Sequence, residues 1–140
     1  MRKNENDPRP NYLRRTFGAL LCLSPLGIAS VSLGWGMVHL HTAHLFVIGV
    51  SLGLMTLAVL VSAMNFYLSF IRPARFQHKP DYHFVSGIPM VGSLLVTAGS
   101  LIGFGSVIQA MVGIVALLID TGGSVWFLIA TWRDTGFWDA

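Results

Sequence analysis

The residue with the clearest chemical potential is Asp120, an acid near the middle of an apolar run from Ser106 to Trp132. A charged side chain at the centre of a bilayer costs at least about 2.5–3.5 kcal/mol, so it normally faces other helices or a wet cavity. At 100° per residue, one narrow stripe of a helix in this run collects six polar and small residues. These are Ser106, Gln109, Gly113, Asp120, Ser124 and Thr131. We therefore expect Asp120 to face protein and not lipid.

A polar intramembrane site is expected around Asp120, Thr121, Gly122 and Gly123, together with Asn65 and Gln109. Two adjacent glycines weaken a helix by about 1 kcal/mol each relative to alanine. They either open a break that Asp120 or Thr121 caps, or permit close packing while Asp120 bonds to a hydroxyl or to Asn65. Three roles stay open for Asp120. They are a structural hydrogen bond, an ion or proton site such as broken helices form in transporters, and a contact to another protein.

The sequence gives little support for metal binding or catalysis. His39, His41 and His44 have a spacing that zinc or copper accepts, but no Cys, Asp or Glu accompanies them, so interfacial histidines at a turn are favoured. The remaining acids fall in tails and loops, at Glu5, Asp7, Asp81, Asp134 and Asp139. No Ser-His-Asp set, metalloprotease motif or phosphate loop is present, so we expect no enzyme and no cofactor.

The elements that position these residues are membrane helices. Of the 140 residues, 54% are hydrophobic and only 11% are charged, whereas a soluble domain carries about a quarter charged residues. Four apolar blocks are long enough, or nearly so, to cross about 30 Å of hydrocarbon. The sequence therefore predicts an all-α protein, an integral membrane four-helix bundle. Its spans are expected at 17–38, 44–71, 84–104 and 106–132, between polar tails at 1–16 and 133–140.

The positive charges predict the orientation. All nine Lys and Arg residues lie in the first tail, in the loop between the second and third spans, or after the fourth span. The positive-inside rule makes that side cytoplasmic, so both termini are expected inside. Arg14 and Arg15 before an apolar run also resemble a twin-arginine signal. The run continues to Val38 without a polar region, which favours an uncleaved first span.

Small residues predict how the helices pack, because they let backbones approach closely. The second span carries Gly49 and Gly53 on one face and Ser51, Ala58, Ser62, Asn65 and Ser69 almost opposite, which predicts a helix sandwiched between two neighbours. Gly92, Gly99 and Gly103 align in the third span, Gly113 lies in the fourth, and Gly27 and Gly34 share a face of the first. The short Gly103–Gly105 turn predicts an antiparallel hairpin of the last two spans. Trp132 and Trp138 are expected at the membrane interface.

The segments Pro89–Leu95 and Asp120–Phe127 together resemble small multi-pass inner-membrane proteins of proteobacteria, some of which look like immunity proteins encoded beside secreted toxins. The resemblance covers the second half of the chain and carries over no functional residue. It implies a bacterial inner-membrane location and a binding role.

From these observations we expect a non-enzymatic membrane protein that acts by helix–helix or partner-protein binding, such as an immunity protein against a membrane-directed toxin. The expected partners are the bilayer and another membrane or toxin protein, or a second copy of the chain. Nucleic acid is not expected, because the net charge of +3 follows from the topology. The alternative is a small oligomeric ion- or proton-coupled transporter or channel that uses Asp120.

Overall fold

The computed structural model describes residues 11–39, 44–76 and 87–138, and every element within these ranges is helical. The elements are α1 (Tyr12–Val38), α2 (Leu45–Phe66), the π-helical turn η1 (Tyr67–Ile71), α3 (Arg72–Phe76), α4 (Val91–Ile102), α5 (Val107–Ile119), α6 (Ser124–Thr131) and α7 (Thr135–Trp138). Three stretches are long and apolar enough to cross a membrane: 12–38, 45–75 and 107–131. The prediction of an all-helical protein is therefore confirmed for the described residues, with three helices long and apolar enough to span a membrane.

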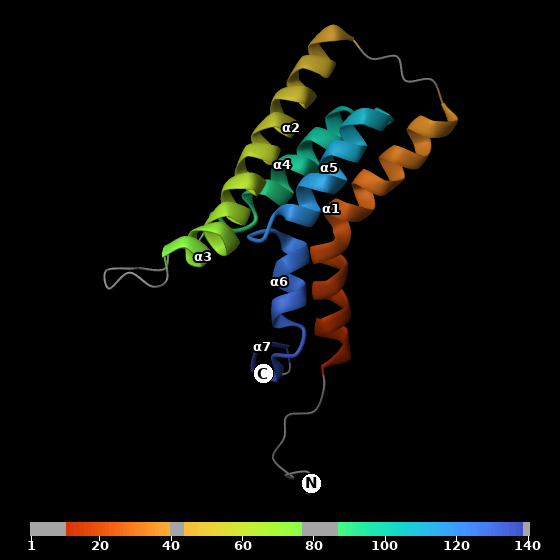
Figure 1. The fold of residues 1–140 in the computed structure, drawn as a ribbon. Helices are drawn as coiled ribbons and strands as arrows, with labels where there is room; N and C mark the ends of the chain where they lie inside the picture. The colour runs from red at the N-terminus through yellow and green to blue at the C-terminus, as the bar shows by residue number, and fades with distance from the viewer. Residues whose placement is uncertain (1–10, 40–43, 77–86, 139–140) are drawn as a thin grey trace, which may run out of the picture.

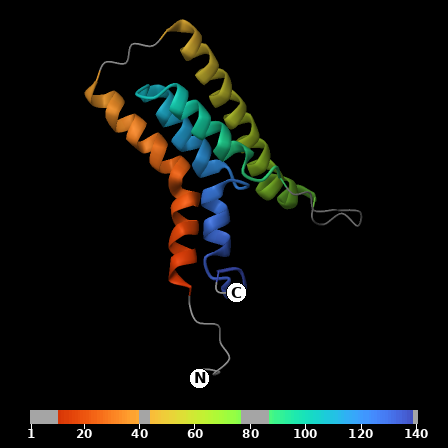
Figure 2. The ribbon, with the colours of Figure 1, turned by 180° about the vertical axis from the view of Figure 1, so that it is seen from behind.

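Helices α4 and α5 form the centre of the bundle. They are joined by a short turn as an antiparallel hairpin, α2 packs along both of them, and α1 packs along them from another side (Figures 1 and 2). Helix α1 contains Pro25 and bends within its length, so that its first half lies beside α6 (Figure 1). The start of α1 and α7 lie at one end of the molecule, and the α4–α5 turn lies at the other.

The third helix differs from the sequence expectation, and the fourth takes one of the two forms that the sequence left open, a break at its glycine pair. The third begins at Val91 and not at residue 84, because Gly87–Met90 is not helical. Pro89 supplies no backbone N–H and disfavours a helical Ile88, while Met90 has a left-handed φ of 62°. The run from 106 to 132 is divided by a break at Asp120–Gly123 into α5 and α6. Two irregular backbone segments therefore meet inside the bundle.

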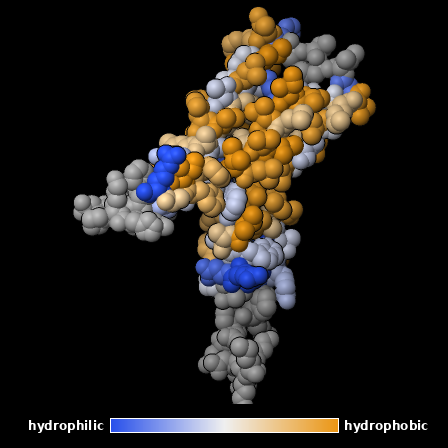
Figure 3. All heavy atoms as spheres, in the orientation of Figure 1, coloured by the Kyte–Doolittle hydropathy of each residue, from blue (hydrophilic) through white to orange (hydrophobic). Residues whose placement is uncertain are grey.

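The interior of the bundle consists mostly of small side chains and is partly polar, and its exterior is apolar. Buried residues around the centre include Met55, Ala58, Val96, Ala116 and Leu117, together with six serines: Ser32, Ser51, Ser62, Ser93, Ser100 and Ser124. Figure 3 shows hydrophobic side chains over much of the helical body, with hydrophilic ones at α3 and near the start of α1. This distribution suits a lipid environment, since hydrocarbon solvates the apolar exterior.

Several of the predicted packing glycines lie at close helix contacts. A Cβ added to Gly99 would lie 3.1 Å from Met55 Cε, and one on Gly113 would lie 3.0 Å from Val96 Cγ1. A Cβ on Gly103 would overlap the Gln109 side chain.

Gly49 and Gly53, by contrast, lie at no close helix contact in the described chain. They lie on the outward face of α2, and no atom of the described chain comes within 4 Å of a Cβ added to either. The expected sandwich of α2 is therefore only half present in a single chain. Gly27 and Gly34 of α1 are likewise open, because α1 buries a different face that includes Cys22, Pro25, Ala29 and Ser32.

Trp138 also departs from expectation. It was expected on the membrane headgroups, but only 3% of it is exposed, and it packs with Cys22 and Leu128. Its Nε1 donates to the Thr131 carbonyl at 2.7 Å. The ring fits there because Gly18 leaves space for it: a Cβ on Gly18 would overlap the indole. The prediction failed because this gap in α1 becomes visible only once α1 and α6 are placed side by side.

Gly18→Leu should expel Trp138 from its place between α1 and α6, because the new side chain would occupy the position of the indole. Carboxypeptidase digestion of the protein in mild detergent should then remove the C-terminal residues faster than in the wild type. Gly27→Leu is the matched control, since it adds the same side chain to α1 where space is open. Equal digestion of both variants would contradict this packing.

Candidate functional site: a buried polar junction

The candidate site is the place where α2 meets the two irregular segments, Gly87–Met90 and Asp120–Gly123. At its centre Asn65 and Asp120 are both fully buried, with exposed fractions of 0%. Asn65 Nδ2 donates to Asp120 Oδ1 at 2.6 Å. The expectations that Asp120 faces protein and that Asn65 lies close to it agree with this geometry.

The orientation of the Asn65 amide is set by the backbone of Ile88. Ile88 N–H donates to Asn65 Oδ1 at 2.8 Å, and Asn65 Nδ2 donates to the Ile88 carbonyl at 3.0 Å. Reversing the amide would place two donors and two acceptors against each other, so only one orientation satisfies both bonds. The second Nδ2 hydrogen must then point at Asp120, whose Oδ1 acts as an acceptor. Asn65 therefore binds the segment before α4 and the break after α5 at the same time.

Four glycines make room for this pair. A Cβ on Gly87 would overlap Asn65 Oδ1, and one on Gly122 would lie 2.6 Å from Asn65 Nδ2. A Cβ on Gly92 would overlap Asp120 Oδ2, and one on Gly123 would lie 2.7 Å from the same oxygen. These close approaches explain the Gly122-Gly123 pair in steric terms. The glycines admit the polar side chains between the backbones of three elements.

The peptide groups freed by the break find partners from other elements. Ser124 N–H at the start of α6 donates to Ser93 Oγ of α4 at 2.9 Å, and the Leu118 carbonyl accepts from Trp126 Nε1 at 2.8 Å. Met90 N–H donates to the Gly122 carbonyl at 2.8 Å. Neither Asp120 nor Thr121 caps α6 with its side chain, because the N-cap is Gly123 and Ser93 takes that role. Thr121 Oγ1 instead bonds to Ser69 Oγ at 2.8 Å.

A few buried polar atoms of the junction remain unpaired within the described residues. They are Asp120 Oδ2, Ser62 Oγ and Ser124 Oγ. Asp120 Oδ2 and Ser62 Oγ both face Gly92. A lone carboxylate oxygen beside hydroxyls can accept a proton or contact a small cation, and it offers no nucleophile with an adjacent base.

The residues predicted to form one polar site lie at two separate places in the structure. Asp120, Thr121, Gly122, Gly123 and Asn65 lie together at the junction, whereas Gln109 lies near the other end of α5. There Gln109 Oε1 accepts from Ser51 Oγ at 2.6 Å. The residues that sequence reasoning missed are Gly87, Ile88 and Ser93. Ser93 stands on the small-residue face of its helix, but its partner Ser124 is 31 positions away, so no local pattern signals the bond.

The histidines form no metal centre in the part of the chain that the structure describes. His39 stacks on Trp35 with ring centroids 4.1 Å apart, and its Nδ1 lies 3.3 Å from the Trp35 carbonyl. His44 is exposed at the start of α2. His41 lies outside the described residues.

Comparison with known proteins adds no further assignment: no protein-family model, no curated protein and no solved structure matches this chain. The role of the junction therefore has to be argued from its geometry.

Asn65→Leu should lower the free energy of unfolding by at least about 2 kcal/mol, because both backbone groups of Ile88 and the Asp120 carboxylate lose their partner together. Reversible unfolding in lipid bicelles measures this loss. Ser69→Ala is the control, since it removes one part-buried hydroxyl bond at the edge of the same junction. It should cost less than about 1 kcal/mol. Losses of equal size would show that Asn65 is not the central contact.

Proposed function

We propose that this chain is a non-enzymatic integral membrane protein that acts by binding other helices within the membrane. The observation that carries the proposal is a contrast between two faces of α2. The inward face, with Ser51, Ser62 and Asn65, is buried against the rest of the chain, and the outward face at Gly49 and Gly53 meets no other described helix. Small residues on a membrane helix are suited to close contact with a partner helix.

The polar junction supports the same proposal, because most of its hydrogen bonds hold the chain's own backbone. Asn65 bonds to Ile88, and Ser93 bonds to Ser124. A junction built this way fixes the shape of the helices and leaves recognition to their outer surfaces. In the described chain Asp120 and Asp134 are the only acids, which supports a function without acid–base catalysis.

We further propose four membrane crossings with both termini in the cytoplasm of a bacterial cell. The twelve residues of α4 rise about 18 Å. This is shorter than the hydrocarbon thickness of about 30 Å, so the proposed third crossing includes the non-helical Gly87–Met90 turn before α4. Non-helical backbone is tolerated at membrane depth where its polar groups are hydrogen-bonded, and this segment bonds to Asn65 of α2 and to Gly122 of the α5–α6 break. The start of α1, α3 and the segment after α6 carry Arg14, Arg15, Arg72, Arg75 and Arg133, which favours the cytoplasmic side for these parts.

Cysteine labelling tests this orientation. In a Cys22→Ala background, His44→Cys should react with a membrane-impermeant maleimide in intact cells. Ala74→Cys and Asp134→Cys should react only after the membrane is opened. All three positions are exposed, and none of the changes removes an arginine. Labelling of Ala74→Cys or Asp134→Cys in intact cells would contradict cytoplasmic termini.

An immunity protein against a membrane-directed toxin is the form of this function that the sequence resemblance favours. The apolar exterior of the bundle and the open face of α2 at Gly49 and Gly53 support such a role. Crosslinking in intact membranes, followed by purification in mild detergent and mass spectrometry, tests the binding role. A stoichiometric second protein or a discrete homo-oligomer supports it, and a monomer with neither contradicts it.

The second candidate is a small ion- or proton-coupled transporter. One observation favours it: Asp120 Oδ2 lies at a helix break with no hydrogen bond inside the described chain, and the unpaired hydroxyl of Ser62 faces the same glycine, Gly92. Transporters place coupling sites at such broken helices.

Asp120→Asn separates the two candidates. Asparagine keeps an Oδ1 acceptor for Asn65 and removes the ionisable group, so partner binding should stay within about twofold and the free energy of unfolding within about 1 kcal/mol of the wild type. Pulldown and bicelle unfolding measure these quantities. A parallel flux assay in proteoliposomes tests the alternative, because a coupling site would lose its flux in Asp120→Asn. Loss of binding in a folded Asp120→Asn protein would contradict the structural role of the junction.

A further inference from the structure

The carboxyl of Asp120 has one oxygen that the hydrogen bonds of the junction do not use. Asn65 Nδ2 donates to Oδ1 at 2.6 Å, and the backbone of Gly122 is a second donor to the carboxyl. Oδ2 has no hydrogen bond to any described residue, although the side chain is fully buried. A polar atom buried in a membrane protein is costly to leave unpaired, so this oxygen requires a ligand of its own.

Two serine hydroxyls face Oδ2 beside the backbones of two glycines. A Cβ added to Gly92 would overlap Oδ2 and lie 3.3 Å from Ser62 Oγ. One added to Gly123 would lie 2.7 Å from Oδ2 and 2.8 Å from Ser93 Oγ. Ser93 Oγ already accepts the first backbone N–H of α6, whereas Ser62 Oγ is buried and unpaired, as Oδ2 is. Ser62 is therefore the hydroxyl available to this carboxyl.

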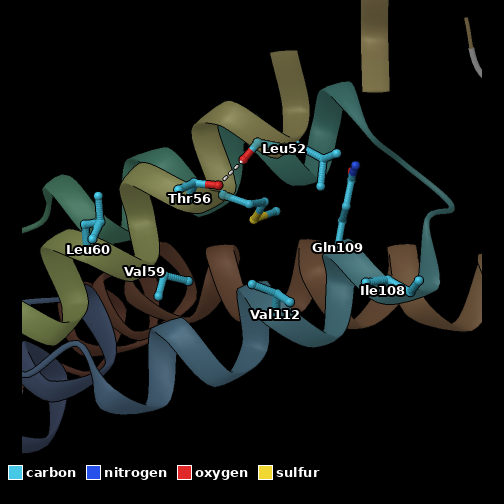
Figure 4. A pocket seen from close by; sticks show the side chains of 8 residues that line it. Leu52, Thr56, Val59, Leu60, Ile108, Gln109 and Val112 are labelled. Atoms are coloured by element: carbon cyan, nitrogen blue, oxygen red, sulfur yellow. Dashed lines mark hydrogen bonds between the residues drawn. The ribbon is translucent and has the colours of Figure 1, made fainter. Parts of the chain in front are cut away.

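The Ser62 hydroxyl differs in orientation from other hydroxyls on the same bundle. Thr56 Oγ1, one and a half turns earlier on α2, donates to the Leu52 carbonyl at 2.8 Å (Figure 4), and Thr97 of α4 makes the same kind of bond at 2.8 Å. Such bonds to the carbonyl four residues earlier are common for hydroxyls within helices. Ser62 Oγ makes none and faces α4 beside Asp120. Its oxygen is thus turned toward the carboxyl and not toward its own helix.

No charge balances an ionised Asp120 in the elements that form the junction. Helices α2, α4, α5 and α6 and the segment Gly87–Met90 contain no titratable side chain. The groove on the outer side of α2 and α5, which Figure 4 shows, is also lined by no charged residue. Both donors to the carboxyl are neutral amides. An isolated carboxylate removed from water and from any cation takes up a proton and becomes neutral.

The titratable groups on the neighbouring elements lie elsewhere. Tyr67 of η1 is exposed. On α1, Cys22 packs in the separate cluster that contains Trp138. Arg14 and Arg15 lie at the start of α1, where they contact the segment after α6. None of these groups supplies a counter-charge to the junction.

We propose that Asp120 is a proton-binding site, in which Oδ2 holds a proton taken up from water and donates it in a hydrogen bond to Ser62 Oγ. Oδ1 remains the acceptor for Asn65. The Ser62 hydroxyl then turns its own hydrogen to the Ala58 carbonyl, as Thr56 does to Leu52. Every polar atom of the site has a partner in this form, and the junction carries no net charge within the membrane.

The surroundings of Oδ2 suit a proton better than a divalent cation. Such a cation takes about six oxygen ligands, whereas Oδ2 is faced by two hydroxyls and lies against the backbones of Gly92 and Gly123. A proton needs one acceptor, and Ser62 provides it.

This inference goes beyond the proposed function, because it concerns the charge of the junction and requires neither a partner nor transport. It also gives the Asp120→Asn variant a chemical meaning. Asparagine reproduces the neutral acid, with an amide N–H in place of the protonated Oδ2.

Infrared spectroscopy of the protein in lipid bilayers detects the proton. An ordinary aspartate is ionised at neutral pH, so the wild type should show the carbonyl stretch of one protonated carboxylic acid there. The stretch should be lost in Asp120→Asn. Asp134→Asn is the matched control, since it removes an exposed acid, and it should retain the stretch. A wild type without this stretch, or a stretch that persists in Asp120→Asn, would overturn the proposal.

The acceptor is tested by removing one hydroxyl at a time. Ser62→Ala should shift the stretch to a higher frequency, because hydrogen bonds to a carboxylic acid lower it. Ser100→Ala removes another buried, unpaired hydroxyl, about two turns beyond Gly92 on α4. It should leave the frequency unchanged. An unchanged frequency in a folded Ser62→Ala protein would overturn the assignment of Ser62 as the acceptor.

Spectra in sodium and in potassium buffers separate a proton from a metal ion. The protonated-acid stretch should be the same in both. An ionised Asp120 whose carboxylate signal changes when potassium replaces sodium overturns the proton in favour of a cation. An ionised Asp120 that responds to neither salt overturns a ligand altogether. Both of these outcomes leave the proposed binding function intact.

Discussion

The structure depends on one constraint: backbone that is not helical must still be fully hydrogen-bonded where no water reaches it. The described part of the chain contains two such segments within the bundle, Gly87–Met90 before α4 and Asp120–Gly123 between α5 and α6, and they lie against each other. The Asn65 carboxamide forms hydrogen bonds with the backbone N–H and the carbonyl of Ile88. Its remaining Nδ2 hydrogen is donated in a hydrogen bond to Asp120. One side chain on a long regular helix thereby fixes the start of α4 and the end of α5.

The rest of the bundle follows from this arrangement. Polar side chains can enter the centre only where the backbones leave room, so glycines surround Asn65 and Asp120. The helices around them are held by small residues and hydroxyls, and their large apolar side chains turn outward to lipid. Because the interior is occupied by the chain's own contacts, the proposed binding function falls to the outer helix faces. On α2 this outer face carries Gly49 and Gly53, which meet no other described residue.

The sequence predicted the features that leave a local or periodic pattern of residues along the chain. The helices, the inward direction of Asp120 and the Gly103–Gly105 hairpin follow from apolar run length, a 100° stripe and turn residues. The sequence offered Asn65 only as one of two kinds of partner for Asp120, the other being a neighbouring hydroxyl. It did not predict the late start of α4, because a side-chain bond from Asn65 to the Ile88 backbone crosses 23 positions without a local signature. The sequence also did not predict that Gly49 and Gly53 lie on a face of α2 with no neighbouring helix in the described chain. Small residues mark a contact surface, but they do not say whether the neighbour belongs to the same chain.

The central claim is that Asn65 and Asp120 are bonded to each other inside the folded protein in a membrane. Solid-state NMR in lipid bilayers tests it most directly, through the dipolar coupling between 15N-labelled Asn65 Nδ2 and 13C-labelled Asp120 Cγ. An Nδ2–Oδ1 contact of 2.6 Å predicts a strong coupling between these nuclei. A coupling too weak to detect would place the two side chains apart and contradict the account of the junction.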